Sequence, residues 1–108
     1  MKLAYFIGLF HVLPMPRPIQ ATLHTAALRH NLAQIRQCAP HSKVMAVVKA
    51  DGYGHGAVTV AQAALKGGAS SFGVATLAEA IELRQAGIKQ PVLVLGNLLE
   101  PEEFRCCL

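Results

Sequence analysis

The 108-residue sequence lacks tryptophan, has only 6% aromatic residues and carries charged side chains at only 15% of its positions. Of its three cysteines, Cys38 stands alone and Cys106 and Cys107 are adjacent. Neither CxxC spacing nor histidines at ligand spacing accompany them, so we predict no disulfide framework and no metal site. Apolar residues make up 53% of the chain, which excludes a disordered tail and predicts one small domain built on a buried α/β sheet.

The net charge is positive, but the cations are not clustered. Ten Lys and Arg against six Asp and Glu give a formal +4, and the basic residues are scattered from Lys2 to Arg105. A nucleic-acid surface needs clustered cations or interleaved aromatic residues. We therefore predict no nucleic-acid partner, and a small anionic ligand fits the charge better.

The first residues differ in character from the rest of the chain. Met1 and Lys2 precede an apolar stretch at residues 3–13, which has the length of a signal peptide and is too short to span a bilayer as a helix. No small-x-small cleavage site follows it, only a proline-rich segment at residues 14–18. We interpret residues 1–16 as an extension outside the domain, with Met15 as the native start; a weak export signal is the alternative.

Strand-like and helix-like segments alternate along the rest of the chain. A short strand at residues 19–24 is predicted to precede a helix at 26–38 that Thr25 caps. Apolar runs at 44–48, 71–75 and 91–96 predict buried parallel strands. Helical periodicity separates them at 57–66 and 76–87, and Pro101 fits the first turn of another helix. This βαβαβ rhythm is compatible with an α/β barrel or an open doubly wound sheet, and it predicts a site at the carboxyl ends of the strands.

Lys49 closes the first of these apolar runs, which makes its amine a candidate nucleophile for a Schiff base with an aldehyde. The glycines at positions 52, 54 and 56 allow the backbone to approach a phosphate closely, and Tyr53 lies between two of them. The spacing is neither that of a P-loop nor that of a dinucleotide site. By itself, Lys49 could equally be a solvated charge at the end of a strand.

Other polar residues have ordinary structural interpretations. Asp51 and His55 are expected to stabilise the glycine-rich turn or the start of the next helix. The segment from Thr76 to Glu79 matches a capping box, and Glu79 and Glu82 are expected on a solvated helix face.

The eleven residues from Ala46 to Gly56 resemble the signature around the cofactor lysine of alanine racemases. The similarity extends to residues 27–32, 72–75, 79–80 and 91–96, so it covers about residues 17–99. The resemblance implies a partial (β/α)8 (TIM-type) barrel, of which residues 17–108 would supply the first three or so β/α units. It also implies pyridoxal 5'-phosphate as cofactor and the interconversion of L-alanine and D-alanine through an aldimine, with D-alanine supplied to peptidoglycan synthesis. A cytoplasmic homodimer is implied as well, and export to the periplasm stays the alternative.

The resemblance assigns roles to three residues. Lys49 would bind the cofactor and act as one of two catalytic bases at the substrate Cα. Tyr53 would contact the cofactor phosphate, and Leu95 would line the pocket near the ring. The second base, a tyrosine in the family, and the arginine at the pyridine nitrogen have no counterpart within the 108 residues.

A barrel of this kind needs roughly 250 residues, so we expect residues 17–108 to be a truncated amino-terminal part, inactive alone. Two other functions stay open. One is a pyridoxal-phosphate-binding carrier protein of the single-barrel type, against which residues 51–55 argue. The other is a noncatalytic α/β interaction domain.

Overall fold

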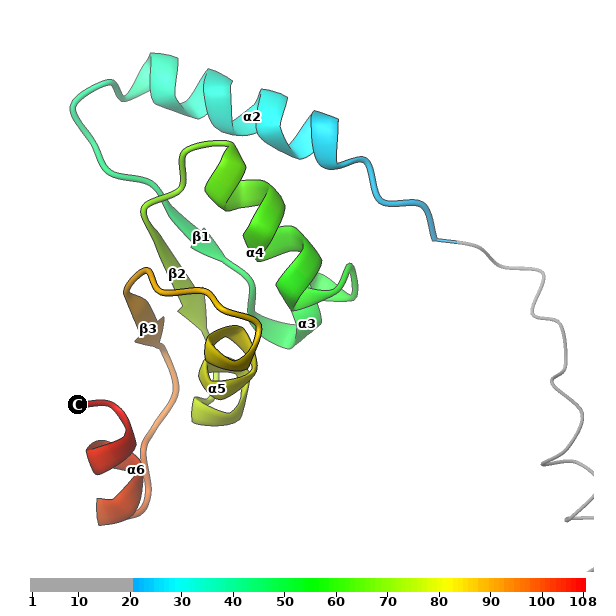
Figure 1. The fold of residues 1–108 in the computed structure, drawn as a ribbon. Helices are drawn as coiled ribbons and strands as arrows, with labels where there is room; N and C mark the ends of the chain where they lie inside the picture. Colours follow the sequence, from blue (N-terminus) through cyan, green and yellow to red (C-terminus); the bar gives the residue numbers. More distant parts are fainter. Residues whose placement is uncertain (1–20) are drawn as a thin grey trace, which may run out of the picture.

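The computed structural model describes residues 21–108, in which three strands are separated by helices as predicted, with an additional short helix, α3, after the first strand (Figure 1). The helices are α2 (Thr25–Cys38), α3 (Lys49–Tyr53), α4 (Ala57–Lys66), α5 (Leu77–Gln85) and α6 (Pro101–Cys106). The strands are β1 (Met45–Val47), β2 (Ser71–Val74) and β3 (Val92–Val94). The three predicted strands are confirmed, although each is shorter than its apolar run, and α4 has the predicted bounds. Their predicted burial is confirmed for β2 alone, because β1 and β3 each have half-exposed or exposed side chains.

The three strands form one parallel sheet in the order β1-β2-β3. Val47 pairs with Gly73 across β1 and β2, and Gly73 pairs with Leu93 across β2 and β3. Parallel neighbours need a crossover, and helices α4 and α5 supply the two crossovers. The α/β class is therefore confirmed, and the described residues form an open three-stranded sheet rather than a closed barrel.

One face of the sheet carries the hydrophobic core. Phe72 and Val74 are fully buried there, together with Leu83 of α5. Helix α4 contributes a row of alanines that includes Ala61 and Ala64, both buried. These alanines belong to the same buried cluster as Phe72 and Val74, and α2 packs across α4 (Figure 1). This packing holds the carboxyl ends of the strands at one edge.

The opposite face of the sheet is apolar but open. Met45, Val47 and Leu93 are 43%, 40% and 48% exposed. Gly73 lies between them, and a Cβ at this position would come within 3.3 Å of Val47 Cγ2 and 3.5 Å of Met45 Sδ. The strands thus present apolar side chains on both faces, while only one face is packed within the described residues.

Two predictions near the amino-terminal end are wrong. Residues 21–24 of the predicted strand 19–24 form no strand, because none of the three described strands pairs with them and β1 is the edge of the sheet. Thr25 is not the N-cap of α2; His24 occupies that position and makes no side-chain cap bond. Residues 1–16 and the first two residues of the predicted strand lie outside the described residues.

Other local predictions are confirmed. The capping box of α5 forms in both directions, because Glu79 N donates to Thr76 Oγ1 and Thr76 N donates to the Glu79 carboxylate. Pro101 lies in the first turn of α6. No helix between residues 21 and 108 has the length and apolarity needed to cross a membrane.

The one-sided core predicts different costs for truncating two large apolar side chains. Phe72→Ala should lower the free energy of unfolding by about 3–5 kcal/mol, because it opens a cavity in the packed face. Leu93→Ala removes a half-exposed side chain and should cost about 0.5 kcal/mol. Urea denaturation followed by circular dichroism measures both. Equal losses for the two variants would show that the open face is packed in solution.

Candidate functional site

Lys49 begins α3 directly after β1 and is half-buried. The element that follows is an unusual turn, because Ala50 and Asp51 have φ of 50° and 54° with ψ of 51° and 44°. Gly52 and Tyr53 continue with φ of 62° and 55°. These values belong to the left-handed helical region, so residues 50–53 form a left-handed turn beside Lys49.

The left-handed turn is strained at its non-glycine positions. The left-handed conformation costs an L-residue roughly 1–2 kcal/mol, so Ala50, Asp51 and Tyr53 together cost about 3–6 kcal/mol. Such strain persists only where surrounding contacts impose it, and it concentrates at functional sites. The hydrogen bonds around the turn therefore determine whether Lys49 keeps its position.

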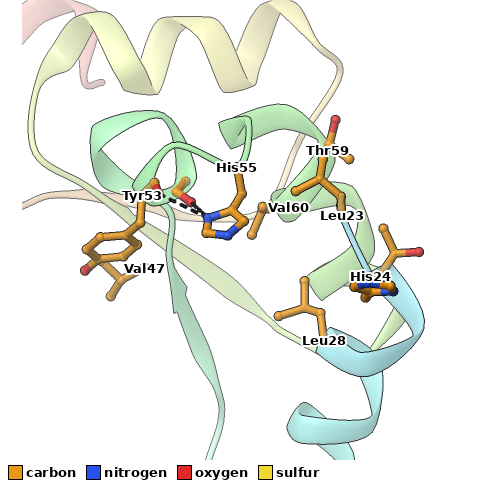
Figure 2. A pocket seen from close by; sticks show the side chains of 10 residues that line it. Leu23, His24, Leu28, Val47, Tyr53, His55, Thr59 and Val60 are labelled. Atoms are coloured by element: carbon orange, nitrogen blue, oxygen red, sulfur yellow. Dashed lines mark hydrogen bonds between the residues drawn. The ribbon is translucent and has the colours of Figure 1, made fainter. Parts of the chain in front are cut away.

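Two side chains within the loop stabilise the turn. Asp51 Oδ1 accepts a hydrogen bond of 2.9 Å from Ala57 N and so caps the start of α4. His55 Nδ1 lies 3.1 Å from the carbonyl oxygens of both Gly52 and Tyr53 (Figure 2), and it must carry a hydrogen to donate to them. Both residues thus have the structural roles that we expected from the sequence.

Glu79 joins the turn to the next β/α unit. Its Oε1 accepts from Ala50 N at 2.8 Å, and its Oε2 accepts from Ala75 N at 2.6 Å and Thr76 N at 3.1 Å. The predicted cap on a solvated helix face is confirmed, but the contact with Ala50 was not predicted, because packing of α5 brings this carboxylate to a segment 29 residues earlier in the chain. The capping box was visible in the sequence, but no local signal pointed to Ala50.

The environment of Glu79 favours its ionised form. Partial burial raises the pKa of Glu79, but the N–H donors of Ala75, Ala50 and Thr76 and the charge of Lys49 lower it, and the net pKa is below its ordinary value. At neutral pH a carboxylate therefore lies close to the lysine that begins the turn.

The other two predicted site residues lie at the same edge of the sheet. Tyr53 ends α3 and is 60% exposed, and its ring lies beside Val47 (Figure 2). Leu95 follows β3 and leans over the middle strand, since a Cβ on Gly73 would lie 3.7 Å from Leu95 Cδ1. Lys49 and Tyr53 thus share one short element, and Leu95 extends over the open face from two strands away.

A hollow of about 320 Å³ lies beside the turn (Figure 2). Its lining is mainly apolar and comes from the start of α2, the turn, the end of β1 and the first turn of α4: Leu23, His24, Thr25, Leu28, Val47, Gly52, Tyr53, His55, Thr59 and Val60. Tyr53 is the one predicted site residue in this lining, so the hollow adjoins the candidate site and does not contain Lys49.

Metal chemistry has no support in the part of the chain that the structure describes. Residues 21–108 contain no group of three or more His, Cys, Asp or Glu side chains that could hold a metal ion. Cys38, Cys106 and Cys107 are all exposed and unbonded. The chemistry available at the candidate site is that of an amine and a phenol.

Crowding in the turn predicts unequal effects of two glycine substitutions. Gly52→Ala and Gly54→Ala both place a Cβ at a positive φ, at a cost of about 1–2 kcal/mol. At Gly52 the new Cβ would also come within 3.2 Å of Val60 Cγ2 and 3.4 Å of the Ala57 backbone, whereas at Gly54 nothing lies within 4 Å. Urea midpoints should therefore fall further for Gly52→Ala. Equal midpoints would show that the turn is not packed against α4 in solution.

The lowered pKa of Glu79 predicts an acid-dependent stability. A carboxyl whose folded pKa lies below its ordinary value near 4.5 stabilises the fold above that pH, and this stabilisation is lost as the pH falls through the folded pKa. Urea midpoints between neutral pH and about pH 3 should fall less steeply for Glu79→Gln than for the unmodified chain. Parallel profiles would contradict the bonds assigned to Glu79.

Comparisons with known proteins agree with the resemblance of the lysine segment. A family model described as "Alanine racemase, N-terminal domain" matches residues 23–108. A curated alanine racemase of Prochlorococcus marinus is 68% identical over 65 residues, which are 60% of this chain and 17% of that protein.

Solved structures of racemases are also similar to this chain. An alanine racemase from E. faecalis aligns with a TM-score of 0.68 at 50% identity, over 71% of this chain and 21% of that one. A histidine racemase from Leuconostoc mesenteroides aligns with a TM-score of 0.70 at 39% identity, over 76% of this chain and 22% of that one. The chain thus spans about a fifth of the length of these relatives. It belongs to the alanine racemase family and corresponds to part of the family's N-terminal domain.

Proposed function

We propose that these residues supply the cofactor-binding lysine of an enzyme that interconverts L-alanine and D-alanine with pyridoxal 5'-phosphate. The observation that carries this proposal is the left-handed turn, which places Lys49 and Tyr53 on one short element within the segment that matches the family. Tyr53 follows Lys49 by four residues, so the two ends of this element carry the two candidate side chains.

The residues present fit this cofactor. Lys49 is half-buried, Tyr53 is exposed, and at Gly54, which follows Tyr53, an added Cβ would meet nothing within 4 Å. Open space at a glycine allows the backbone to approach a phosphate. Bound pyridoxal phosphate would supply an aldehyde that bonds to the lysine amine and a ring that spreads the negative charge of the deprotonated substrate.

Each predicted site residue then has a place in the proposal. Lys49 would hold the cofactor through its amine and would also move a proton at the substrate Cα on one face. Tyr53 would donate its hydroxyl hydrogen to the phosphate group. Leu95 would provide apolar contact near the ring. The opposite base comes from outside the 108 residues.

Several features of the whole enzyme belong to the same proposal. The product D-alanine serves peptidoglycan synthesis, and the active form is a cytoplasmic homodimer. The 108 residues by themselves neither racemise alanine nor retain the cofactor, because one apolar face of the sheet is open and the second base is missing. Histidine is the second candidate substrate, since a histidine racemase aligns with this chain at 39% identity.

Covalent trapping tests the role of Lys49. Residues 23–99 would replace the corresponding segment of the Prochlorococcus marinus alanine racemase, and the purified chimaera would be reduced with borohydride in the presence of pyridoxal phosphate. Mass spectrometry should find the pyridoxyl group on Lys49, and Lys49→Ala should abolish both the label and racemisation of alanine. Lys66→Ala is the matched control, because this exposed lysine ends α4. Label on another lysine, with activity kept in Lys49→Ala, would refute the proposal.

The phosphate contact predicts a smaller effect. Tyr53→Phe in the same chimaera should raise the dissociation constant of pyridoxal phosphate about tenfold, the equivalent of one lost hydrogen bond to a charged group. Absorbance titration of the cofactor measures this change. An unchanged constant would remove Tyr53 from the phosphate site. Assays with L-alanine and L-histidine then compare the two candidate substrates.

A further inference from the structure

The carboxylate of Glu79 contacts two loops that are far apart in the sequence. Glu79 Oε1 binds Ala50 N after β1, and Glu79 Oε2 binds Ala75 N and Thr76 N after β2. Ala50 directly follows Lys49 and is the first residue of the left-handed turn, with φ of 50°. One side chain therefore joins the start of the strained turn to the end of the middle strand.

This bond differs from the others that support the turn. Asp51 and His55 make their side-chain bonds inside the loop between β1 and α4. They stabilise the shape of the loop but do not tie it to another strand. Glu79 reaches the loop from α5, which packs against β2 and β3. The backbone bond from Val48 N to Gly73 O ties the start of the loop to β2, and Glu79 is the side chain that ties the turn itself to the next β/α unit.

The charge of Glu79 also acts on Lys49. Three N–H donors and the nearby ammonium keep the pKa of this carboxyl below its ordinary value, so it is ionised at neutral pH. An ionised acceptor makes a stronger hydrogen bond than a neutral one. Its negative charge also interacts with the positive charge of Lys49.

We propose that Glu79 is a positioning residue, which fixes the Lys49 amine by holding the Ala50 N–H at the start of the left-handed turn. Its importance for catalysis rests on the proposed function of Lys49. Its effect on the turn does not, so it can be tested without cofactor.

Amide exchange in the 108-residue chain is the first test. In Glu79→Gln, the Ala50 amide should exchange about tenfold faster than in the unmodified chain, because the loss of the charge weakens one hydrogen bond. The Phe72 amide, which donates to Pro91 O within the sheet, should keep its rate. Glu82→Gln is the matched control, because Glu82 is exposed on the same helix.

Chemical labelling reports on the lysine itself. Reductive methylation should label Lys49 faster in Glu79→Gln, because the amine loses its carboxylate neighbour and the turn loosens, while labelling of Lys66 should not change. Glu79→Asp keeps the charge on a shorter side chain, so its rate of Lys49 labelling should lie between those of Glu79→Gln and the unmodified chain. If Glu79 only stabilised the fold as a whole, Glu79→Gln would accelerate amide exchange at Phe72 as much as at Ala50.

The outcomes distinguish the positioning role of Glu79 from the proposed function of Lys49. An Ala50 amide that exchanges freely in the unmodified chain, equal acceleration at Ala50 and Phe72, or an unchanged ratio of Lys49 to Lys66 labelling would each overturn the positioning role. Absence of borohydride label on Lys49 in the chimaera would instead overturn the proposed function, whatever the exchange rates show.

Discussion

The left-handed turn after β1 is the constraint on which the candidate site depends. Right-handed backbone is the default for L-residues, so a turn that runs through Ala50, Asp51 and Tyr53 at positive φ exists only because other groups hold it. Asp51 and His55 shape the loop from within, and Glu79 anchors it from the next β/α unit. These bonds from within the loop and from α5 together fix the backbone that directly follows Lys49.

The one-sided core explains how a small sheet supports that turn. Phe72 and Leu83 bury the helix-covered face and fix α5 against β2 and β3. Because α5 is fixed, Glu79 in its first turn is fixed too. The open face, with Val47 and Leu93, adds little to stability within the described residues, but it is the side over which Leu95 extends. The core on the helix-covered face of the sheet thus fixes the position of Glu79 at the edge where the strands end.

Local sequence patterns predicted the elements well where a single physical signal dominated. The apolar runs at 44–48, 71–75 and 91–96 became the three parallel strands, and Thr76 with Glu79 formed the expected capping box. The prediction failed at residues 21–24, because alternation of apolar and polar residues makes a strand only where a neighbouring strand can pair with it.

For the candidate site, too, some features followed from the sequence and others only from the tertiary structure. The sequence alone determined the family and nominated Lys49 and Tyr53 as candidate site residues, because both lie within one contiguous segment that can be recognised without knowledge of the fold. Only the tertiary structure decided the left-handed course of residues 50–53 and the contact between Glu79 and Ala50. The physical reason is that residue order sets local periodicity and capping, whereas a bond across 29 residues exists only after α5 has packed onto the sheet.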